Sequence, residues 1–514
     1  MPTPLDKILD CHPYNPDDIQ IFLTISSLYS FFTKNGLVQR WLEVNWVAKN
    51  SSDGDIINVY NQDPIHNSSE KPLLTMYPKK YPSGYFRTAI KIPVEASFLN
   101  PQQKSPCMGY WATYFNEKGK IQASTCLKMH PFWMERISKY ISHLRLDEIM
   151  IPGSHDSGSF SYNKKTIPYT GYKYSQELSI FNQMVYGLRY FDLRVGYYEK
   201  TYAKYFINHN FLKTDHTVKS VLDQVKLFLK TSKREIIILD FHNFPHGFKT
   251  EEIHVKLLNL IKSELGLFFI PYNLSNTTLN NIWKSDKNII VSYNYKFKNG
   301  TPAYLWPSIP RAWGNKHDKE SLRAYFQEVF SKPTPKGLWA AMAEMTPDTL
   351  FILLHPENGL RNMAEQINKE VTHWFRDLYW QKANIVATDY FLGNHVIDVA
   401  IQTNQLKVKL RYCKKLRLYY NSNLEKENPF STIKHGEGAA KRYQANGSHF
   451  DAMTVLSCPK PIPKVNLVSR PKHNTVFVGI TRVDNQRECN NIQGNAQICQ
   501  MKQLRCHTDE TTKM

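Results

Sequence analysis

The sequence lacks any long apolar run. Of its 514 residues 42% are hydrophobic, yet no stretch approaches the ~20 apolar residues that span a bilayer. The longest apolar-looking segment, residues 19–32, is interrupted by glutamine, threonine and serine and is typical of a strand. The first residues also show neither the basic nor the apolar region of a signal peptide. We therefore expect a protein that does not span a membrane.

Cysteine is scarce and unevenly placed. None of the eight cysteines lies between residues 127 and 412, and no two have the Cys-x-x-Cys spacing of a zinc site. A disulfide framework is unexpected in a chain this long. We therefore expect a reducing compartment, with the protein in the cytoplasm and peripherally attached to membranes. Six Asn-x-Ser/Thr sequons point the other way, although an Asn-rich chain contains several by chance: Asn50, Asn67, Asn273, Asn276, Asn299 and Asn446.

Acidic residues are outnumbered. There are 45 Asp and Glu against 65 Lys and Arg, a net charge of +20. The net charge is +2 over residues 1–131, +8 over 132–407 and +10 over 408–514, so half of the excess lies in the last fifth of the chain. Such a balance favours anionic lipid surfaces, phosphorylated substrates or nucleic acid as partners. The aromatic share of 13% excludes an intrinsically disordered chain.

The first part of the chain has the pattern of a β domain. Residues 19–131 contain short runs rich in β-branched and aromatic residues. Turn signals such as Asn35-Gly36 and Asp53-Gly54 separate these runs. Short strands with frequent turns are typical of a sandwich. We expect an all-β, sandwich-like domain over residues 1–131.

From about residue 145, strands alternate with amphipathic helices. Residues 234–241 form a continuous apolar run, as a buried parallel strand does, and residues 218–229 carry apolar side chains at helical spacing. This alternation predicts an α/β fold, and its length suits a TIM (β/α)8-type barrel over residues 132–407. Residues 408–514 show no repeat and no clear helix, and apart from one candidate strand at 475–480 this basic, Cys-containing tail stays unassigned.

Polar residues stand where several of the predicted strands end. In such barrels, catalysis takes place at the carboxyl ends of the strands. One neutral imidazole can remove a proton from a nucleophilic hydroxyl, and a protonated one can donate to the leaving oxygen. A guanidinium stabilises phosphate oxygens, and carboxylates fix the imidazole tautomers. The pattern predicts phosphoryl transfer by residues from this set: His155, Asp156, Asp192, Arg194, His209, Asp240, His242 and Asp389.

Each of these residues also has a purely structural interpretation. Asp156 could cap the following helix, Asp192 and Arg194 could form a structural ion pair, and Asp240 could bind a loop amide. Three histidines are structural by default: His242, His246 and His254. The recurrence of such residues at successive strand ends favours the catalytic interpretation.

Four blocks occur in a characteristic order. They are residues 152–157 (Pro-Gly-Ser-His-Asp-Ser), residues 187–194 (Gly-Leu-Arg-Tyr-Phe-Asp-Leu-Arg), His209, and residues 235–241 (Glu-Ile-Ile-Ile-Leu-Asp-Phe). Over about residues 140–407 the chain resembles the X domain of phosphatidylinositol-specific phospholipase C, and above all the animal PI-PLC X domain-containing proteins. The N-terminal β region is similar to the extra domain of some arthropod members.

The resemblance implies a distorted TIM barrel and a phosphoric diester hydrolase. Its reaction would cleave phosphatidylinositol to diacylglycerol and inositol 1,2-cyclic phosphate. By motif position, His155 would be the general base and His209 the general acid on the leaving glycerol oxygen. Asp389 would orient the base and Asp156 would support the acid. The remaining pair matches the family's Asp-x-Arg sequence: Asp192 and Arg194.

Arg194 also bears on the question of a metal. In the calcium-dependent signalling phospholipases, which the chain resembles less, a calcium-binding carboxylate stands at this position. A fixed guanidinium supplies positive charge itself and repels a cation. We therefore expect no cofactor and metal-independent catalysis. Substrate contacts are expected from Asp240, from His242 in place of a bacterial lysine, and from Tyr293 near the position of an inositol-contacting arginine.

Other function classes compete with this one. A barrel that binds an inositol phospholipid without turning it over remains an alternative, because the head-group pocket departs from the bacterial pattern. A glycerophosphodiesterase shares the barrel and the histidine pair, but normally has Arg after the first histidine, where this chain has Asp156. A nucleic-acid binder would explain the charge and none of the strand-end residues. We expect phosphatidylinositol or a related anionic phospholipid as the partner, and no nucleic acid.

Overall fold

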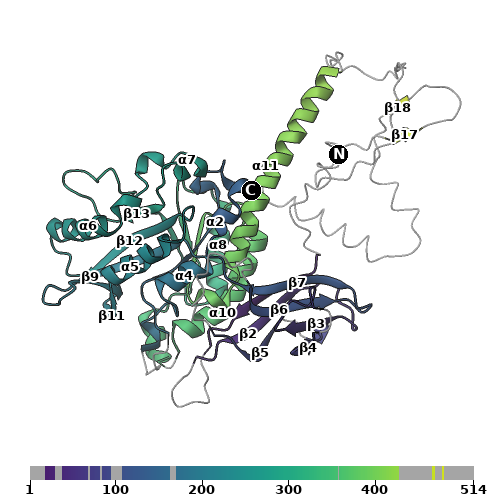
Figure 1. Ribbon diagram of the computed structural model, residues 1–514, viewed down its shortest axis with the longest axis horizontal. Coiled ribbons are helices and arrows are strands. Elements are labelled where there is room, and N and C mark those ends of the chain that lie inside the picture. Colours follow the sequence, from purple (N-terminus) through teal and green to yellow (C-terminus); the bar gives the residue numbers. More distant parts are fainter. Residues whose placement is uncertain are drawn as a thin grey trace, which may run out of the picture. The chain divides into compact units, whose positions relative to one another are not determined.

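The computed structural model describes residues 18–28, 38–67, 70–80, 84–93, 107–162, 170–356, 358–427, 466–468 and 477–479. Met1–Asn421 form one compact unit and Ser422–Met514 form a second. The first unit contains a β-sandwich and an α/β barrel (Figure 1).

Seven strands of the described chain form the sandwich, as predicted. One sheet has the order β1 (Gln20–Ile25), β2 (Trp41–Val47) and β5 (Tyr85–Lys91). The other has the order β4 (Leu74–Met76), β3 (Ile56–Tyr60), β6 (Cys107–Phe115) and β7 (Ile121–Lys128). Neighbouring strands are antiparallel. Apolar side chains from both sheets, such as Val44 and Ile57, share one buried core.

A disulfide joins Cys107 to Cys126 within the second sheet, with the Cα atoms 5.6 Å apart. A disulfide was not expected from the sequence, because a disulfide framework is unusual in a chain of this length. The antiparallel pairing of β6 with β7 sets Cys107 opposite Lys128, two positions from Cys126. Disulfides persist in oxidising compartments. The bond therefore removes the reason for expecting a reducing one.

The barrel is built from parallel strands in the order β14 (Arg311–Trp313), β15 (Ala340–Met342), β16 (Ile385–Thr388), β8 (Ile151–Ser154), β9 (Tyr190–Tyr197), β12 (Ile237–His246) and β13 (Ile289–Tyr293). A hairpin of β10 (Tyr205–His209) and β11 (Leu212–Thr217) pairs antiparallel with β9. In the part of the chain that the structure describes, no ladder joins β13 to β14. The fold is thus a distorted TIM-type barrel, open on one side, which confirms the predicted α/β class.

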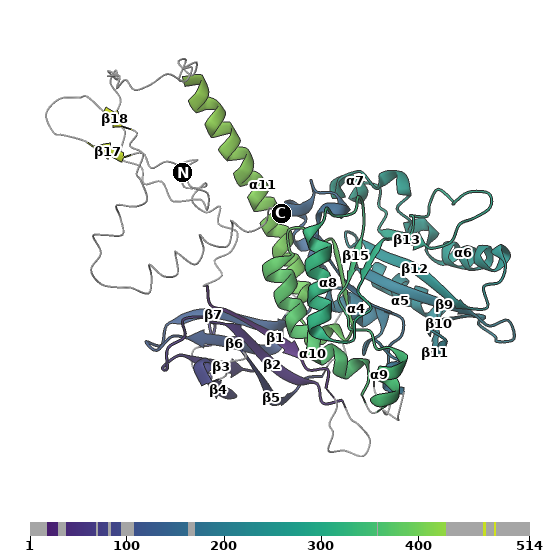
Figure 2. The same cartoon turned by 180° about the vertical axis from the view of Figure 1, so that it is seen from behind.

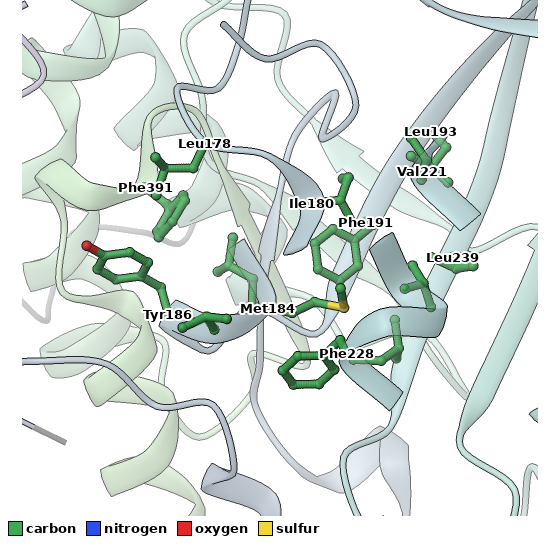
Figure 3. Packing of buried hydrophobic residues seen from close by; sticks show 14 of the residues in the cluster. Leu178, Ile180, Met184, Tyr186, Phe191, Leu193, Val221, Phe228, Leu239 and Phe391 are labelled. Carbon is green, nitrogen blue, oxygen red and sulfur yellow. The ribbon is translucent and has the colours of Figure 1, made fainter. Parts of the chain in front are cut away.

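Helices cover the sheet on its outer side. α4 (Ile180–Tyr186), α5 (Val218–Leu229) and α6 (Glu251–Leu265) lie on the side of β9 and β12. α8 (Lys319–Ser331) and α10 (Leu360–His373) lie on the side of β15 (Figure 2). Figure 3 shows Met184 of α4 and Phe228 of α5 beside Phe191 and Leu239 of the strands, all of them buried. Shorter helices are α2 (Trp133–Arg136), α3 (Ser138–Ile141), α7 (Leu279–Trp283), α9 (Thr349–Leu354), a π-helical turn at Trp374–Leu378, and single 3-10 turns.

The last helix, α11 (Val396–Glu427), runs without a break across residue 407. The expectation of no clear helix after this point is wrong up to residue 427, because the basic sequence there has no apolar periodicity to reveal a helix. In the second unit, β17 (Asn466–Val468) pairs antiparallel with β18 (Phe477–Gly479), which lies inside the candidate strand at 475–480. None of the described helices is both long and apolar enough to cross a bilayer.

Buried charges join the sandwich to the barrel. Glu177 of the barrel pairs with Arg40, which precedes β2, and with Arg361 of α10. Glu365 of α10 accepts a hydrogen bond of 3.1 Å from the backbone N–H of Ser27. Breaking a buried ion pair by removing one partner costs about 3–5 kcal/mol. These contacts therefore hold the two parts firmly together.

Candidate active site

The predicted strand-end residues meet at the carboxyl end of the parallel strands. His155 follows β8, Asp192 and Arg194 lie in β9, His209 ends β10, and Asp389 follows β16. The two imidazoles are almost inaccessible, with exposed fractions of 7% for His155 and 8% for His209. The structure thus brings together residues that are spread over more than 230 positions of sequence.

The hydrogen bonds of His155 define its protonation state. Its Nδ1 lies 2.9 Å from Oδ1 of Asp389, and its Nε2 faces Nη2 of Arg194. Because a guanidinium can only donate, Nε2 accepts and Nδ1 carries the proton. Burial, together with the charge of Arg194, lowers the pKa of His155 well below its ordinary value. A neutral ring with its electron pair at Nε2 is the state that a general base requires.

His209 lies beside Asp156, as predicted. Its Nε2 is 3.7 Å from Oδ2 of Asp156, whose backbone adopts a left-handed φ of 39°. Among the described residues, the carboxyl oxygens of Asp156 have no hydrogen-bond partner. Burial raises the pKa of Asp156 to about 7 and lowers the pKa of His209 to about 4. A strained turn of this kind is typical of functional sites.

Asp192 is the ionised centre of the cluster. Its Oδ2 accepts hydrogen bonds from Nη2 of Arg194 at 3.3 Å and from the amide of Asp156 at 3.1 Å, and its Oδ1 accepts one from Nη2 of Arg311 at 2.9 Å. Burial opposes ionisation, but the charges of Arg311 and Arg194 outweigh it and hold the pKa of Asp192 well below its usual range. Asp192 therefore fixes Arg194 next to the imidazole of His155.

Arg311 of β14 belongs to the site, although it was not among the predicted residues. The same Nη2 that contacts Asp192 also donates to Oδ2 of Asp240 at 2.8 Å. Asp240 further accepts hydrogen bonds from the hydroxyls of Tyr190 at 2.7 Å and Ser292 at 2.8 Å. Its carboxylate is fully buried and occupied by these three donors. The structure therefore gives Asp240 the task of holding Arg311, whereas the sequence predicted a substrate contact.

Glu344 is a second residue that sequence reasoning missed. It follows β15, and its Oε1 lies 3.8 Å from Nε2 of His155. Within the described residues, neither of its carboxyl oxygens has a hydrogen-bond partner, although both are buried. Burial raises the pKa of Glu344 well above its ordinary value, which favours the protonated carboxyl. A signal existed, because Glu344 is the first polar residue after the buried run 339–343.

The two remaining predicted residues differ in their placement. His242 lies in β12 at the edge of the cluster, where burial and the charge of Arg311 lower its pKa. Tyr293 is not brought to the cluster. Its hydroxyl lies 2.9 Å from Nδ1 of His254, and its ring packs against Phe244 at a centroid distance of 4.8 Å. Tyr293 thus belongs to an aromatic cluster on the outside of the sheet.

The cluster is suited to chemistry on a phosphate ester. Two guanidiniums, Arg194 and Arg311, provide planar donors of the geometry that phosphate oxygens accept. Two imidazoles, His155 and His209, are groups of the kind that accept and donate protons in such reactions. The surrounding buried carboxyls balance these charges when no anion is bound.

Comparison with known proteins agrees with this description. No family model matches the chain. The chain is 26% identical over 327 residues to PI-PLC X domain-containing protein 1 of Homo sapiens, covering 57% of this chain and 99% of that protein. It is 28% identical over 307 residues to PI-PLC X domain-containing protein 2 of Mus musculus (53% and 87% covered). It is 25% identical over 303 residues to protein 3 of the same organism (53% and 92% covered).

Solved structures of bacterial enzymes are also similar in part. The phosphatidylinositol-specific phospholipase C of Staphylococcus aureus has a TM-score of 0.41 and 18% identity, covering 54% of this chain and 97% of that one. The enzyme of Listeria monocytogenes has a TM-score of 0.41 and 16% identity, with 54% and 98% covered. The sequence relatives, which the chain covers almost end to end, carry the resemblance: over more than half of its length the chain is similar to the PI-PLC X domain-containing proteins.

Proposed function

We propose that this protein is a phosphodiesterase that cleaves phosphatidylinositol to diacylglycerol and inositol 1,2-cyclic phosphate without a metal ion. A continuous line of contacts carries the proposal. Nε2 of His155 contacts Arg194, Nη1 of Arg194 lies 4.0 Å from Asp156, and Asp156 lies 3.7 Å from Nε2 of His209. A base, a phosphate-binding cation and an acid are thus arranged in sequence.

In the proposed reaction each of these residues has one role. Nε2 of His155 takes the proton of the inositol 2-hydroxyl as its oxygen attacks the neighbouring phosphorus. The bond from phosphorus to the glycerol oxygen breaks, and His209 protonates that oxygen so that diacylglycerol leaves. Asp389 would stabilise the imidazolium that forms on His155, because its carboxyl group accepts a hydrogen bond from Nδ1–H. The product is the cyclic phosphate, and the two histidines end with exchanged protonation states.

Positive charge for the transition state would come from the two arginines. Arg194 contacts the base directly and would move onto the phosphate when substrate enters. Arg311 stays anchored between Asp192 and Asp240 and keeps Asp192 ionised. Removing one donor that stabilises a developing oxyanion typically costs about 3–4 kcal/mol in the barrier. We therefore expect turnover in the presence of a chelator.

An exposed apolar patch supports a membrane surface as the place of action. The patch consists of Leu350, Leu353 and Leu354 of α9, which are 64%, 59% and 66% exposed and lie on one face of an uncharged helix. The half-exposed Trp313 at the end of β14 donates a hydrogen bond of 2.9 Å to Thr346, in the segment leading into α9. Both elements follow strand ends of the catalytic side, where an apolar surface can enter the lipid boundary.

The decisive experiment compares two substrates. Wild type is assayed with phosphatidylinositol in vesicles and with a short-chain phosphatidylinositol that is dispersed in solution, each with and without chelator. We expect turnover of both, unaffected by the chelator. Replacing the three leucines of the patch by serine should reduce activity on vesicles and leave activity on the dispersed substrate intact. A matched control replaces exposed apolar residues of the outer helices, Leu227 and Val255, by serine.

A binding protein without turnover is the second candidate. Arg194 occupies Nε2 of His155, and the pKa of His209 is lowered to about 4, so the acid is mostly unprotonated at neutral pH before an anion binds. If wild type binds vesicles that contain phosphatidylinositol and releases no diacylglycerol from either substrate, this second function replaces the first.

A further inference from the structure

The amino-terminal end of the barrel carries an open pocket of about 500 Å3. Its walls come from α3, from the segment that leads into β12, and from α7 with the residues that follow it. All three segments precede strands of the parallel sheet, so the pocket lies at the end opposite the catalytic residues. The residues that matter here are Lys139, Lys233, Arg234, Trp283 and Lys284.

Four cations and one carboxylate line this pocket. Lys139, Lys233, Arg234 and Lys284 are all exposed, and across the described ranges no ion pair involves any of them. A single carboxylate, Asp286, lies in the lining. Like charges around one concave surface repel each other and concentrate anions there. An anion in the pocket would relieve that repulsion.

The walls of the pocket are fixed to one another. Nη1 of Arg234 donates to Oγ of Ser138 at 3.1 Å, and the indole N–H of Trp283 donates to the carbonyl of Arg234 at 2.8 Å. The backbone N–H of Asn280 donates a hydrogen bond of 2.8 Å to the carbonyl of Ser142 and ties α7 to the end of α3. The guanidinium of Arg234 lies over the Trp283 ring, 5.9 Å from its centroid. These contacts hold Arg234 and the backbone of the pocket walls in place.

We propose that this pocket binds a soluble anion that carries two or more phosphate groups. Guanidinium and ammonium groups are the usual phosphate ligands, and serine and asparagine side chains add neutral donors. The volume lies in the range of small-molecule sites. The proposal is independent of the proposed catalytic function, because no residue of the pocket belongs to the catalytic cluster.

The position of the pocket favours a soluble ligand over a lipid in the membrane that the catalytic end contacts. Arg234 precedes β12, and His242 lies eight residues further along the same strand direction. At about 3.3 Å per residue, the two are roughly 25 Å apart along the strand. A flat bilayer against the catalytic end cannot reach a pocket at the other end.

The test measures binding of tripolyphosphate to the full chain by titration calorimetry at low ionic strength. The pocket variant carries Lys139→Gln, Lys233→Gln and Lys284→Gln. We expect its Kd to rise about tenfold or more. The control variant removes the same charge from exposed lysines of the sandwich, through Lys71→Gln, Lys118→Gln and Lys120→Gln, and should bind like wild type.

Two further arms separate the sources of phosphate. Arg194→Gln alters the catalytic cluster and should leave the tight tripolyphosphate site intact. Sedimentation with phosphatidylcholine vesicles that contain phosphatidylinositol 4-phosphate should be the same for wild type and the pocket variant. The proposal is overturned if tripolyphosphate does not bind to wild type, or if the pocket variant binds it with the same Kd. It is also overturned if the control variant loses as much affinity as the pocket variant, or if only Arg194→Gln loses affinity. A pocket variant that loses vesicle binding alone would make the ligand a lipid head group.

Discussion

Asp389 lies 2.9 Å from Nδ1 of His155, although 234 positions separate the two residues in the sequence. The contact exists because β16 pairs with β8 in parallel, with Thr388 opposite Ser154. The residues that follow these two neighbouring strands therefore share one edge of the sheet. The orientation of the base thus depends on how the last strand of the barrel meets its first.

Replacing Asp389 by Asn tests this relationship. The amide no longer stabilises an imidazolium and permits the wrong tautomer of His155, so we expect kcat to fall on the order of 10²–10⁴-fold with little change in KM. Turnover of phosphatidylinositol in mixed micelles measures this effect. Asp377→Asn, a half-exposed residue outside the cluster, serves as the control and should retain full activity. Unchanged kcat in Asp389→Asn would remove this residue from the mechanism.

The two histidines can be told apart by the leaving group. His155→Ala should abolish turnover of every substrate, because the attacking hydroxyl still needs a base. His209→Ala should lose about 10²–10⁴-fold on phosphatidylinositol and much less on a nitrophenyl ester of inositol phosphate, whose leaving group needs no proton. Release of nitrophenol gives the rate directly. Equal losses on both substrates in His209→Ala would contradict its assignment as the acid.

His209 should contribute a loss of stability in mild acid. The pKa of His209 is lowered to about 4 in the folded protein, against about 6.5 in an unfolded chain. Between these values His209 binds more protons in the unfolded state, so its contribution to the free energy of unfolding decreases as pH falls, whereas the raised pKa of Asp156 acts in the opposite direction. The decrease from this residue is about 2 kcal/mol by pH 5.

Denaturant unfolding of wild type and His209→Gln at neutral and mildly acidic pH measures this contribution. We expect His209→Gln to lose less stability on acidification than wild type. His66→Gln, at an exposed site of the sandwich, should behave like wild type. The same acid sensitivity in wild type and His209→Gln would mean that His209 has an ordinary pKa.

The disulfide of the sandwich should contribute measurably to stability. Cys107 and Cys126 close a loop with a sequence separation of 19 residues. A loop of this size corresponds to about 3 kcal/mol through the restricted unfolded chain. We expect the Cys107→Ser, Cys126→Ser double variant to lose about that much free energy of unfolding. Thiol titration of unfolded, unreduced protein shows whether the bond forms, and two extra free thiols in wild type would contradict it.

Arg311 should matter for both folding and catalysis. Arg311→Met leaves the buried carboxylates of Asp192 and Asp240 without their shared cation, so we expect a loss of about 3–5 kcal/mol in stability. Asp192 keeps its contact with Arg194, so adding Asp240→Asn replaces the carboxylate that has lost its cation and should restore part of that loss. Thermal unfolding of the single and double variants measures the recovery. A double variant no more stable than Arg311→Met would show that Asp240 is held by its hydroxyl partners alone.

Sequence reasoning found the site residues that follow conspicuous apolar strands. Asp240 ends such a run, and His155 follows another. Arg311 and Glu344 escaped because β14 and β15 contain only three residues each, one flanked by prolines and tryptophan and the other rich in alanine. Such short strands are stabilised by pairing inside a buried sheet and not by a pattern of their own. The apolar run 339–343 before Glu344 was a local signal, but its alanines do not form a strand pattern.

Tyr293 shows a different limit. Successive side chains of a strand point to opposite faces of a sheet. Ser292, which pairs with Asp240 across the sheet, directs its hydroxyl into the site, and Tyr293 consequently joins the aromatic cluster behind it. A family resemblance locates such a strand to within a residue or two. A shift of one residue moves a side chain from the inner face of the barrel to the outer face.

The sandwich and the barrel share one hydrophobic interior, in which Ile25 and Leu127 belong to the same cluster as Tyr186 and Phe391. A recombinant fragment beginning after residue 131 would expose the apolar barrel surface that the sandwich covers. Such an exposed apolar surface promotes aggregation of the fragment. The change of composition at residue 131 is therefore a poor place to cut. Shortening this protein to the length of its smaller relatives would require polar substitutions on the barrel surface that the sandwich covers.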